Sequence, residues 1–246
     1  MTKTVKILLV FGLVVIASLV VYSFFIEPGM LKVQRLVLTA DSNAKFVFMS
    51  DTHLPSLNEQ EVLRLVREEK PDAVLFGGDA CNVQGADCEK FFSELSNIAP
   101  IYAVLGNNDY FGSRIANATY LNNTKTTILG ITLCGVAYYG PEKTGNCDIS
   151  VVHSYDDIAY ANGSSLVLVG HSHGGQVEIP MVTQAVLDAF LCEGCGTHRY
   201  GEYSDRGMRV YVTSGVGSFL MRPVNLPLNV RFLRPPEIVV VELHRK

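Results

Sequence analysis

A series of short apolar runs, each ending at a polar residue, constrains the fold of this chain more than any other feature. The runs are rich in Val, Ile, Leu and Phe, a composition typical of strands that are buried on both faces. They occupy residues 45–50, 72–78, 101–106, 149–152 and 165–170. The sequence therefore predicts a largely buried system of β-sheets.

Helical segments are predicted between the first of these strands. Asn58 is followed three residues later by Glu61, which resembles a capping box at a helix N-terminus. This helix should end near Lys70, because the residue before Pro71 disfavours helical conformation. A second helix is predicted over residues 89–98. The first half of the chain thus alternates strand and helix.

The second half of the chain is richer in strands. Strands are predicted within residues 128–140, 176–180, 208–216 and 237–245, and one more precedes the series at residues 31–39. About 200 residues follow the N-terminal apolar segment, enough for one domain with a substantial core. No linker is long enough to separate two folded domains. We therefore predict a single α/β domain with mixed sheets.

The N-terminal segment carries no charged residue from position 7 to position 26. A helix of this length spans about 30 Å, the thickness of the hydrocarbon core of a bilayer. We predict an uncleaved transmembrane anchor over residues 1–26, a juxtamembrane connector with the first strand over residues 27–44, and the main domain over residues 45–246. The alternative is a cleaved secretory signal, which has a shorter apolar region and a small-residue cleavage site.

The charges on either side of the anchor predict its orientation. Lys3, Lys6 and the free amino group precede the apolar segment, whereas Glu27, Lys32 and Arg35 follow it. The positive-inside rule then places the N-terminus in the cytoplasm. The main domain of a single-pass membrane protein of this kind would lie on the extracytoplasmic side.

The six cysteines also favour an oxidising compartment. They form pairs that are close in the sequence, and three local disulfides are predicted: Cys81 with Cys88, Cys134 with Cys147, and Cys192 with Cys195. Buried free thiols are the alternative, since Cys is among the most buried residue types. The last pair, in the stretch CEGC, could instead form a redox site, or a zinc knuckle that includes His198.

Polar side chains that commonly bind metals follow five of the apolar runs. Ligands of open α/β sheets bind beyond the carboxyl ends of the strands, so these side chains can share one edge. Imidazole nitrogens with carboxylate or amide oxygens suit Zn, Mn or Fe better than Ca or Mg. Pairs two residues apart point to the same side of an extended chain. The candidate ligands are Asp51, His53, Asp79, Asn107, His153, His171 and His173.

Each of these motifs alone has a structural explanation. An Asp at a strand end is commonly a helix cap or a turn residue, and a single histidine such as His153 commonly makes a structural hydrogen bond. A purely structural explanation of the whole set would need five independent coincidences at equivalent positions. Their joint occurrence therefore favours a metal site.

The five motifs, in order, resemble the signature blocks of the calcineurin-like metallophosphoesterases. The blocks read SDTH at residues 50–53, GGD at 77–79, GNND at 106–109, His153, and GHSHGGQ at 170–176. The resemblance covers roughly residues 45–243 and is strongest to the membrane-associated branch with relatives of UDP-2,3-diacylglucosamine hydrolase. It implies a four-layer α-β-β-α sandwich of two mixed sheets.

The resemblance also implies a role for each candidate ligand. Two divalent transition-metal ions (Mn, Fe or Zn) would bind, and a metal-bound hydroxide would attack the phosphorus atom. Asp79 would bridge the two metals. The remaining ligands would divide into Asp51, His53 and His173 for the first metal, and Asn107, His153 and His171 for the second.

Asn108 departs from the pattern of the family. Most members have a histidine at this position, which lies over the phosphate and can protonate the leaving group. Asn108 can donate a hydrogen bond but cannot supply a proton at neutral pH, and general-acid help is typically worth about 10²–10⁴ in rate. The loss matters least when the leaving group is already acidic. Asn108 and Asp79 are therefore the predicted catalytic residues of a phosphodiester or pyrophosphate hydrolase.

Two other functions fit the same residues. One is a metal-binding scaffold without catalysis, and the other is a phosphomonoesterase such as a phosphoprotein phosphatase, which should need the missing general acid. A net charge of -4 argues against nucleic-acid binding. We expect a monomer that acts on a phosphate-containing small molecule or lipid. The apolar residues 218–232, with Arg222 and Arg231, could face lipid headgroups or pack within the core.

Overall fold

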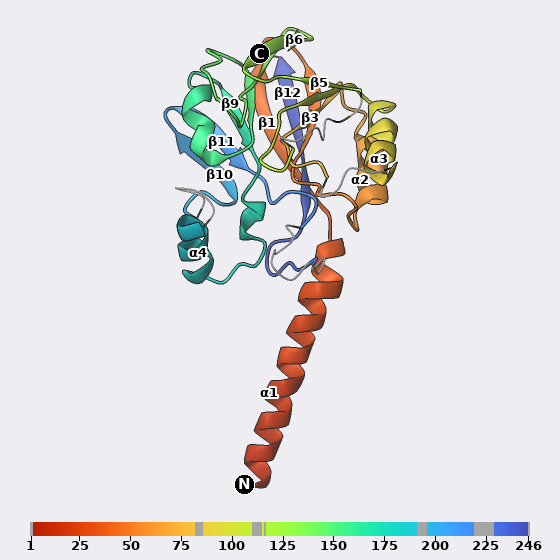
Figure 1. Ribbon diagram of the computed structural model, residues 1–246, viewed down its shortest axis with the longest axis vertical. Coiled ribbons are helices and arrows are strands. Elements are labelled where there is room, and N and C mark those ends of the chain that lie inside the picture. The colour runs from red at the N-terminus through yellow and green to blue at the C-terminus, as the bar shows by residue number, and fades with distance from the viewer. Residues whose placement is uncertain are drawn as a thin grey trace.

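The computed structural model describes residues 2–81, 86–109, 115, 117–190, 196–218 and 229–245. Two mixed sheets of six strands each pack against one another (Figure 1), which confirms the predicted α/β class. The strand order is β1-β12-β2-β3-β4-β5 in the first sheet and β10-β11-β9-β8-β7-β6 in the second.

The strand directions of the first sheet determine the end of the domain at which the carboxyl ends of its strands lie. Strands β2 to β5 are parallel, and β12 runs antiparallel to β2. The C-terminus, which follows β12, lies at the end of the domain opposite the N-terminal helix (Figure 1). Because β2 is antiparallel to β12 and parallel to β3, the carboxyl ends of β2 and β3 lie at the other end, where the N-terminal helix joins the domain. The strands are β1 (Lys32–Ala40), β12 (Glu237–Arg245), β2 (Ala44–Met49), β3 (Ala73–Phe76), β4 (Ile101–Ala103) and β5 (Ala118–Tyr120).

The second sheet has a parallel centre and antiparallel edges. Strands β7, β8, β9 and β11 are parallel, whereas β6 and β10 pair antiparallel at the two edges. The strands are β6 (Thr124–Ile128), β7 (Ile131–Gly135), β8 (Ile149–Val152), β9 (Leu166–Val169), β10 (Gly201–Asp205) and β11 (Met208–Val212). All residues of β8 and β9 are buried, Ser150 included, as their largely apolar sequences predict.

Four layers result from this packing. Phe46 and Leu75 of the first sheet belong to the same core cluster as Leu133 and Val151 of the second, and this cluster fills the space between the sheets. Helices α2 (Glu59–Glu69) and α3 (Ala86–Ser96) share a second cluster with the outer face of the first sheet. The outer face of the second sheet packs against a 3₁₀ helix, η3 (Tyr155–Ala161). The predicted sandwich is confirmed, with 3₁₀ rather than α geometry in this fourth layer.

Two local predictions need correction. Helix α2 ends at Lys70 in a left-handed cap, as expected before Pro71, but Asn58 makes no capping hydrogen bond with its side chain. Its amide donates instead to the carbonyl oxygens of Pro28, at 2.9 Å, and Val216, at 3.3 Å. The strand predicted over residues 176–180 is wrong: Gln176 has a φ of 54°, and an isolated bridge at Val177 replaces a strand.

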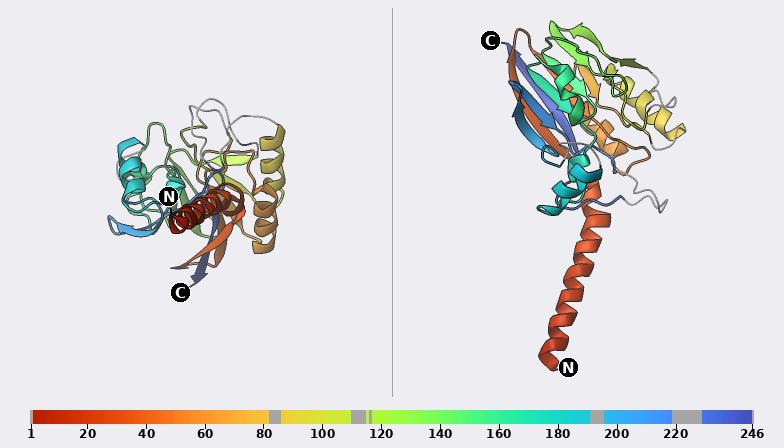
Figure 2. Two further views of the ribbon diagram at one scale, coloured as in Figure 1. Left: turned by 90° about the horizontal axis from the view of Figure 1, so that it is seen from below. Right: turned by 60° about the vertical axis from the view of Figure 1, so that its left-hand side comes forward.

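Helix α1 (Lys3–Val21) projects from one end of the domain, as Figure 1 and the right-hand view of Figure 2 show. None of its residues is buried, and it is long and apolar enough to cross a membrane by length and composition. It continues through a π-helical turn, η1 (Tyr22–Ile26), and a 3₁₀ turn, η2 (Glu27–Gly29). Here the chain enters the domain, because Ser23 and Glu27 are buried.

Two of the predicted disulfides are present. Cys81 is bonded to Cys88, and Cys134 is bonded to Cys147. The third pair, Cys192 with Cys195, lies outside the described residues, as does Arg222.

Candidate metal centre

Five strand ends, three from the first sheet and two from the second, bring the candidate ligands to one place. The chain following β2 carries Asp51 and His53, that following β3 carries Asp79, and that following β4 carries Asn107. From the second sheet, β8 is followed by His153, and β9 by His171 and His173. The contacts below show that the structure brings all seven residues together.

Asp51, His53 and His173 form a first group. Their possible ligand atoms lie within 4.8 Å of one another, and all three side chains are buried. The two Nε2 atoms of His53 and His173 are 3.1 Å apart, and His173 Nε2 lies 3.5 Å from Asp51 Oδ1. This separation suits ligands that point at one common centre.

Asp79 connects this group to a second one. Its Oδ2 lies 3.6 Å from His53 Nε2, and its Oδ1 lies 3.7 Å from His153 Nε2. His153 Nε2 is also 2.9 Å from Asn107 Oδ1, and the ring of His171 is 4.9 Å from that of His153. One carboxylate oxygen of Asp79 therefore faces each group.

The donor set fits divalent cations. The proton on Nδ1 of His153 is directed at the carbonyl oxygen of Gly77, 2.7 Å away, because a carbonyl can only accept. In the neutral ring, Nε2 and Asn107 Oδ1 then face each other as two electron-pair donors, which requires a proton or a metal cation between them. Within the described residues, the buried Asp51 Oδ1 has no hydrogen-bond partner, so it also has a lone pair for a cation.

Burial and neighbouring charges shift the pKa values at this centre. Burial raises the pKa of Asp51 to about 7 and, together with the charge of His153, lowers the pKa of His171 to about 3. Burial alone would raise the pKa of Asp79, but His153, His53 and the hydrogen bonds from Asn108 hold it below the usual value. The carboxylate of Asp79 is thus ionised and His171 is neutral at neutral pH, the forms that bind metals.

The way in which the side chains reach the centre differs from the sequence prediction. Pairs two residues apart were expected to share one side of an extended chain, and this is wrong. The backbone is left-handed at Asp51, His53, Asp79, His171 and His173, with φ between 44° and 67°. Non-glycine residues seldom adopt this conformation, and such strain is concentrated at functional sites. Tight turns, rather than strand alternation, therefore direct these side chains.

Gly78 shows why glycine is needed beside the ligands. Its φ is 92°, and a Cβ atom there would lie 2.5 Å from the backbone nitrogen of Gly106 and 2.8 Å from Nδ1 of His153. Any larger residue would push the loop carrying Asn107 away from Asp79.

Asn108 and Asp109 both contact the strand end that carries Asp79. Asn108 is exposed and donates from its backbone to Asp79 Oδ1, at 2.8 Å, and from its side chain to Asp79 Oδ2, at 2.6 Å. The buried carboxylate of Asp109 accepts from the backbone nitrogens of Asp79, Ala80 and Gly106, at 2.6, 3.0 and 2.9 Å. Asp109 thus joins two loops of the centre, a role that the sequence analysis did not assign.

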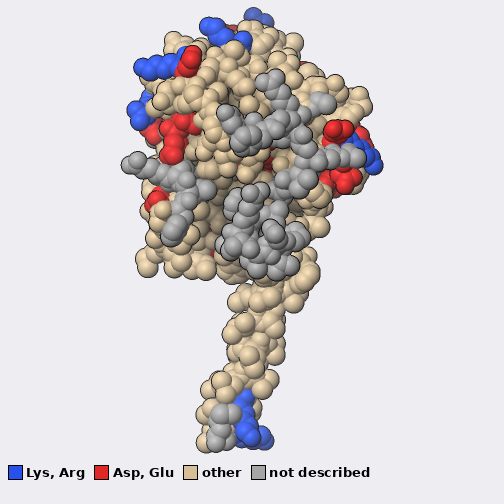
Figure 3. All heavy atoms as spheres, viewed as in Figure 1, with Lys and Arg blue, Asp and Glu red and all other residues tan. Residues whose placement is uncertain are grey.

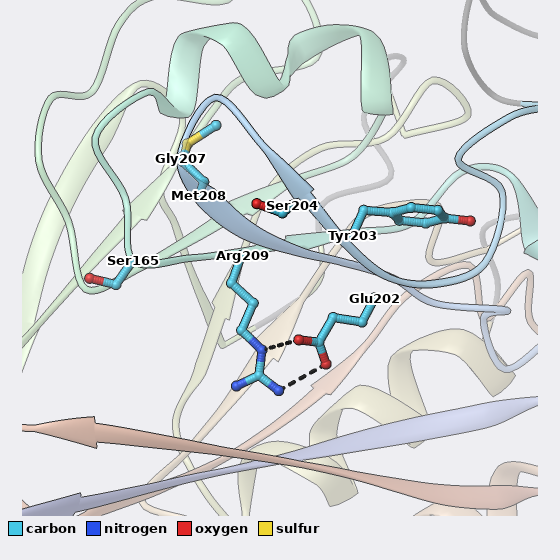
Figure 4. Close-up of a pocket in the computed structure, with 7 residues that line it drawn as sticks. All are labelled: Ser165, Glu202, Tyr203, Ser204, Gly207, Met208 and Arg209. Carbon is cyan, nitrogen blue, oxygen red and sulfur yellow. Dashed lines mark hydrogen bonds and ion pairs between the residues drawn. The ribbon is translucent and has the colours of Figure 1, made fainter.

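An open pocket of the domain lies elsewhere. It has a volume of about 620 Å³ and is located at the amino end of β9 and the β10–β11 hairpin (Figure 4). Its lining residues are Ser165, Glu202, Tyr203, Ser204, Gly207, Met208 and Arg209. Arg209 is held there by Glu202, with Nε 2.6 Å from Oε1. Because the candidate ligands follow the carboxyl end of β9, this cavity is not part of the metal centre.

Comparison with known families identifies the same region of the chain. Residues 45–185 match the calcineurin-like phosphoesterase superfamily domain. This match begins with β2 and extends beyond His173, so it includes all seven candidate ligands.

Individual relatives match over most of the chain. Phosphodiesterase YaeI of Escherichia coli strain K12 is 28% identical over 262 aligned positions, covering 90% of this chain and 92% of that protein. The uncharacterized metallophosphoesterase YkuE of Bacillus subtilis strain 168 is 24% identical, covering 90% of this chain and 88% of the relative. Among solved structures, Yfce, a phosphoesterase from E. coli, has 16% identity and a TM-score of 0.39, covering 74% of this chain and 85% of the other.

Proposed function

The chain belongs to the calcineurin-like phosphoesterase superfamily, and we propose that it is a membrane-anchored, two-metal hydrolase of phosphodiester or pyrophosphate bonds. It is a metal-dependent phosphoesterase. The choice of bond rests above all on Asn108, which occupies the position next to Asp79 where a proton donor would act.

The seven candidate residues would hold two divalent cations. Asp51, His53 and His173 would bind one ion, and Asn107, His153 and His171 the other, with Asp79 between them. The chemistry that two such ions supply when bound is neutralisation of the phosphoryl charge and activation of water. Asp79 is suited to the central position because its two oxygens face different histidines.

Asn108 limits the leaving groups that the site can serve. Its amide lies at the exposed rim of the centre and can donate a hydrogen bond to a phosphoryl oxygen, but it carries no proton that it could transfer at neutral pH. The simple alkoxide of a phosphomonoester needs such a proton. The leaving group of an activated diester or a pyrophosphate departs without one. The relative YaeI, a phosphodiesterase by name, supports the same choice.

The N-terminal helix supports a single membrane span with the domain on the extracytoplasmic side. α1 carries its two basic residues, Lys3 and Lys6, at the end far from the domain (Figure 3). Positive charge of this kind favours the cytoplasmic side. The two disulfides of the domain favour an oxidising compartment. Both observations agree on the orientation.

A pair of aryl phosphates tests the proposed reaction. The full chain in detergent is stripped of metal, reloaded with Mn²⁺, and assayed with bis(4-nitrophenyl) phosphate and 4-nitrophenyl phosphate. We expect turnover of the diester to exceed that of the monoester. Preference for the monoester would indicate a phosphomonoesterase, and turnover of neither would indicate a scaffold without catalysis.

The Asp79→Ala variant tests the central carboxylate in the same assay. It should lose both metals and the activity together, since Asp79 lies between the two groups. The matched control is Glu202→Ala, which removes a carboxylate from the remote cavity and should retain both metals. Full activity in Asp79→Ala would exclude the two-metal site.

A further inference from the structure

We propose that α4 (Val182–Phe190) contacts the surface of the lipid bilayer and holds the metal centre at the level of the lipid headgroups, where it acts on phosphodiesters carried by membrane lipids. The proposed lipid contact is inferred from the structure alone, whereas the proposed substrate class also depends on the proposed function.

One face of α4 is fixed to the domain. Thr183 is buried, and its hydroxyl donates to the carbonyl oxygen of Val177, at 2.6 Å, and accepts from the backbone nitrogen of Ile179, at 2.8 Å. Asp188, the one charged residue of α4, accepts a hydrogen bond from the backbone nitrogen of Gly196. These polar contacts join α4 to the segments directly before and after it, with Thr183 buried and Asp188 exposed.

The other face of α4 is apolar and exposed. Val182 and Val186, one helical turn apart, are 54% and 49% exposed, and the preceding residues Ile179 and Met181 are 46% and 85% exposed. Large apolar side chains grouped in this way mark a contact surface. We call these four residues the α4 patch.

The α4 patch lies at the end of the domain from which α1 projects. Both Figure 1 and the rotated view of Figure 2 show α4 at this end. In the face shown in Figure 3, the charged side chains of the domain gather on its upper part and at its sides, and the described surface next to α1 carries almost none. An uncharged surface is what a membrane-facing end requires, since charged groups are costly to bring into an apolar layer.

Hydrogen bonds hold the junction between α1 and the domain. The backbone nitrogen of Arg231 donates to the carbonyl oxygen of Ser23, at 2.9 Å, and that of Leu233 donates to Glu27 Oε2, at 2.8 Å. The side chain of Asn58 donates to the carbonyl oxygen of Pro28. These bonds connect the chain immediately after α1 to two separate parts of the domain, the segment of Arg231 and Leu233 and the start of α2 at Asn58. With α1 in a bilayer, the domain is held with one fixed end towards the lipid.

The metal centre lies at this same end, beyond the carboxyl ends of β2 and β3. His173 is the first residue of a 3₁₀ turn, η4 (His173–Gly175), which leads through residues 176–181 into α4. Gly175 packs so closely on α4 that a Cβ atom there would lie 2.5 Å from Cγ2 of Thr183. The helix that would rest on the lipid is therefore a direct neighbour of a candidate ligand.

A bilayer fits the α4 patch better than a protein partner does. Four side chains provide far less area than the roughly 800 Å² per partner that a stable protein interface buries. A membrane contact needs less, because α1 already keeps the domain at the surface and each valine adds to an existing attachment. The patch is also on the side from which the predicted membrane anchor leaves.

Tryptophan fluorescence can test the lipid contact, because the chain contains no tryptophan. Single-tryptophan variants of the full chain are reconstituted in vesicles with brominated lipids, which quench tryptophan on contact. Val186→Trp probes the α4 patch. Leu129→Trp is its matched control, since Leu129 is 54% exposed in the β6–β7 turn at the far end of the domain. Leu19→Trp, within α1, reports whether the anchor is inserted.

We expect Val186→Trp and Leu19→Trp to lose fluorescence in brominated vesicles and Leu129→Trp to keep it. Loss in Leu19→Trp alone would overturn the contact while leaving the anchor in place. A blue shift of Val186→Trp without quenching, together with a dimer in sedimentation, would assign the patch to a second copy of the chain and also overturn the proposal.

A matched pair of substrates tests the consequence for catalysis. Val186→Glu places a charge in the α4 patch, and turnover of a diacylglycerol 4-nitrophenyl phosphodiester held in vesicles should fall about tenfold, the equivalent of losing one buried valine. Turnover of soluble bis(4-nitrophenyl) phosphate should stay unchanged. Equal loss on both substrates would overturn the role of the patch. If wild-type enzyme turned over neither substrate, the proposed reaction would fail while the quenching result still decided the lipid contact.

Discussion

At the scale of single residues, Asp79 and its neighbours show what a sequence can and cannot reveal about a site. The identities of the candidate ligands are visible because each follows an apolar run at a strand end. The role of Asp109 is not visible, because it depends on three backbone nitrogens, two of which are about 30 residues away along the chain. The left-handed backbone at Asp51 and His53 is equally hidden, since neither residue type requires it.

Substitutions of Asn108 test its role as a hydrogen-bond donor without a transferable proton. Asn108→Ala should lower kcat/KM for the aryl diester about three- to tenfold, because loss of one neutral hydrogen bond costs about 0.5–1.5 kcal/mol. Asn108→His should raise monoesterase activity relative to diesterase activity by restoring a proton donor. The measurement is kcat/KM on both aryl substrates.

Asn107→Ala is the comparison for these variants. It removes an amide oxygen 2.9 Å from His153 Nε2 and should be far more damaging than Asn108→Ala. If the two alanine variants proved equally inactive, Asn108 would have a role beyond a hydrogen bond. An unchanged substrate ratio in Asn108→His would refute the argument from leaving-group acidity.

At the scale of elements, the strand predictions are correct where burial produces a run of apolar residues. They are wrong where a turn changes the direction of the backbone. Four of the five apolar runs became strands within two residues of their predicted limits, whereas the run at residues 101–106 became the shorter β4 (Ile101–Ala103). Both faces of β8 and β9 are covered. Residues 176–180 alternate polar and apolar side chains, as an exposed strand would. They begin with the left-handed turn at Gly175 and Gln176 and end at Pro180, so they form no strand. The helix predicted after Asn58 is present, but the side chain of Asn58 makes a long-range hydrogen bond to Pro28 instead of capping the helix.

The segment that replaces this strand depends on a compact ion cluster. Glu178 accepts from Arg199, with Nη2 to Oε1 at 2.7 Å and Nε to Oε2 at 2.8 Å, and from Arg234 at 2.8 Å. These hydrogen bonds lower the pKa of Glu178 from 4.5 to about 2. A depressed folded-state pKa stabilises the fold above the unfolded value and ceases to do so as pH falls through the folded value. The contribution is therefore complete above pH 4.5 and lost towards pH 2.

Glu178→Gln should lower the free energy of unfolding by about 1–3 kcal/mol near neutral pH, as expected for hydrogen bonds to charged groups. The difference from wild type should shrink below pH 4.5. Thermal unfolding of both proteins across this range measures it. Glu202→Gln is the matched control: its carboxylate pairs with Arg209 in similar geometry but is 49% exposed, so the change should be close to zero. A pH-independent difference would contradict the assignment to ionised Glu178.

At the scale of the whole molecule, the orientation in the membrane can be tested directly. A membrane-impermeant protease added to intact cells should digest the domain if it lies outside. Thiol labelling before reduction should find Cys81, Cys88, Cys134 and Cys147 unreactive, since all four are in disulfides. A protected domain with reactive thiols would show that the orientation is reversed. The same labelling will decide whether Cys192 and Cys195 are paired.

The hydrogen-bonded junction after α1 has a kinetic consequence. A domain on a flexible tether would sample a hemisphere of solution and meet dissolved molecules. If α1 spans a bilayer as proposed, a domain held through Ser23 and Glu27 keeps its metal centre at one level relative to the lipid headgroups. Encounters with a lipid substrate then occur in two dimensions. The rate should follow the mole fraction of substrate in the bilayer, and diluting the membrane with inert lipid should slow turnover even when the bulk concentration is unchanged.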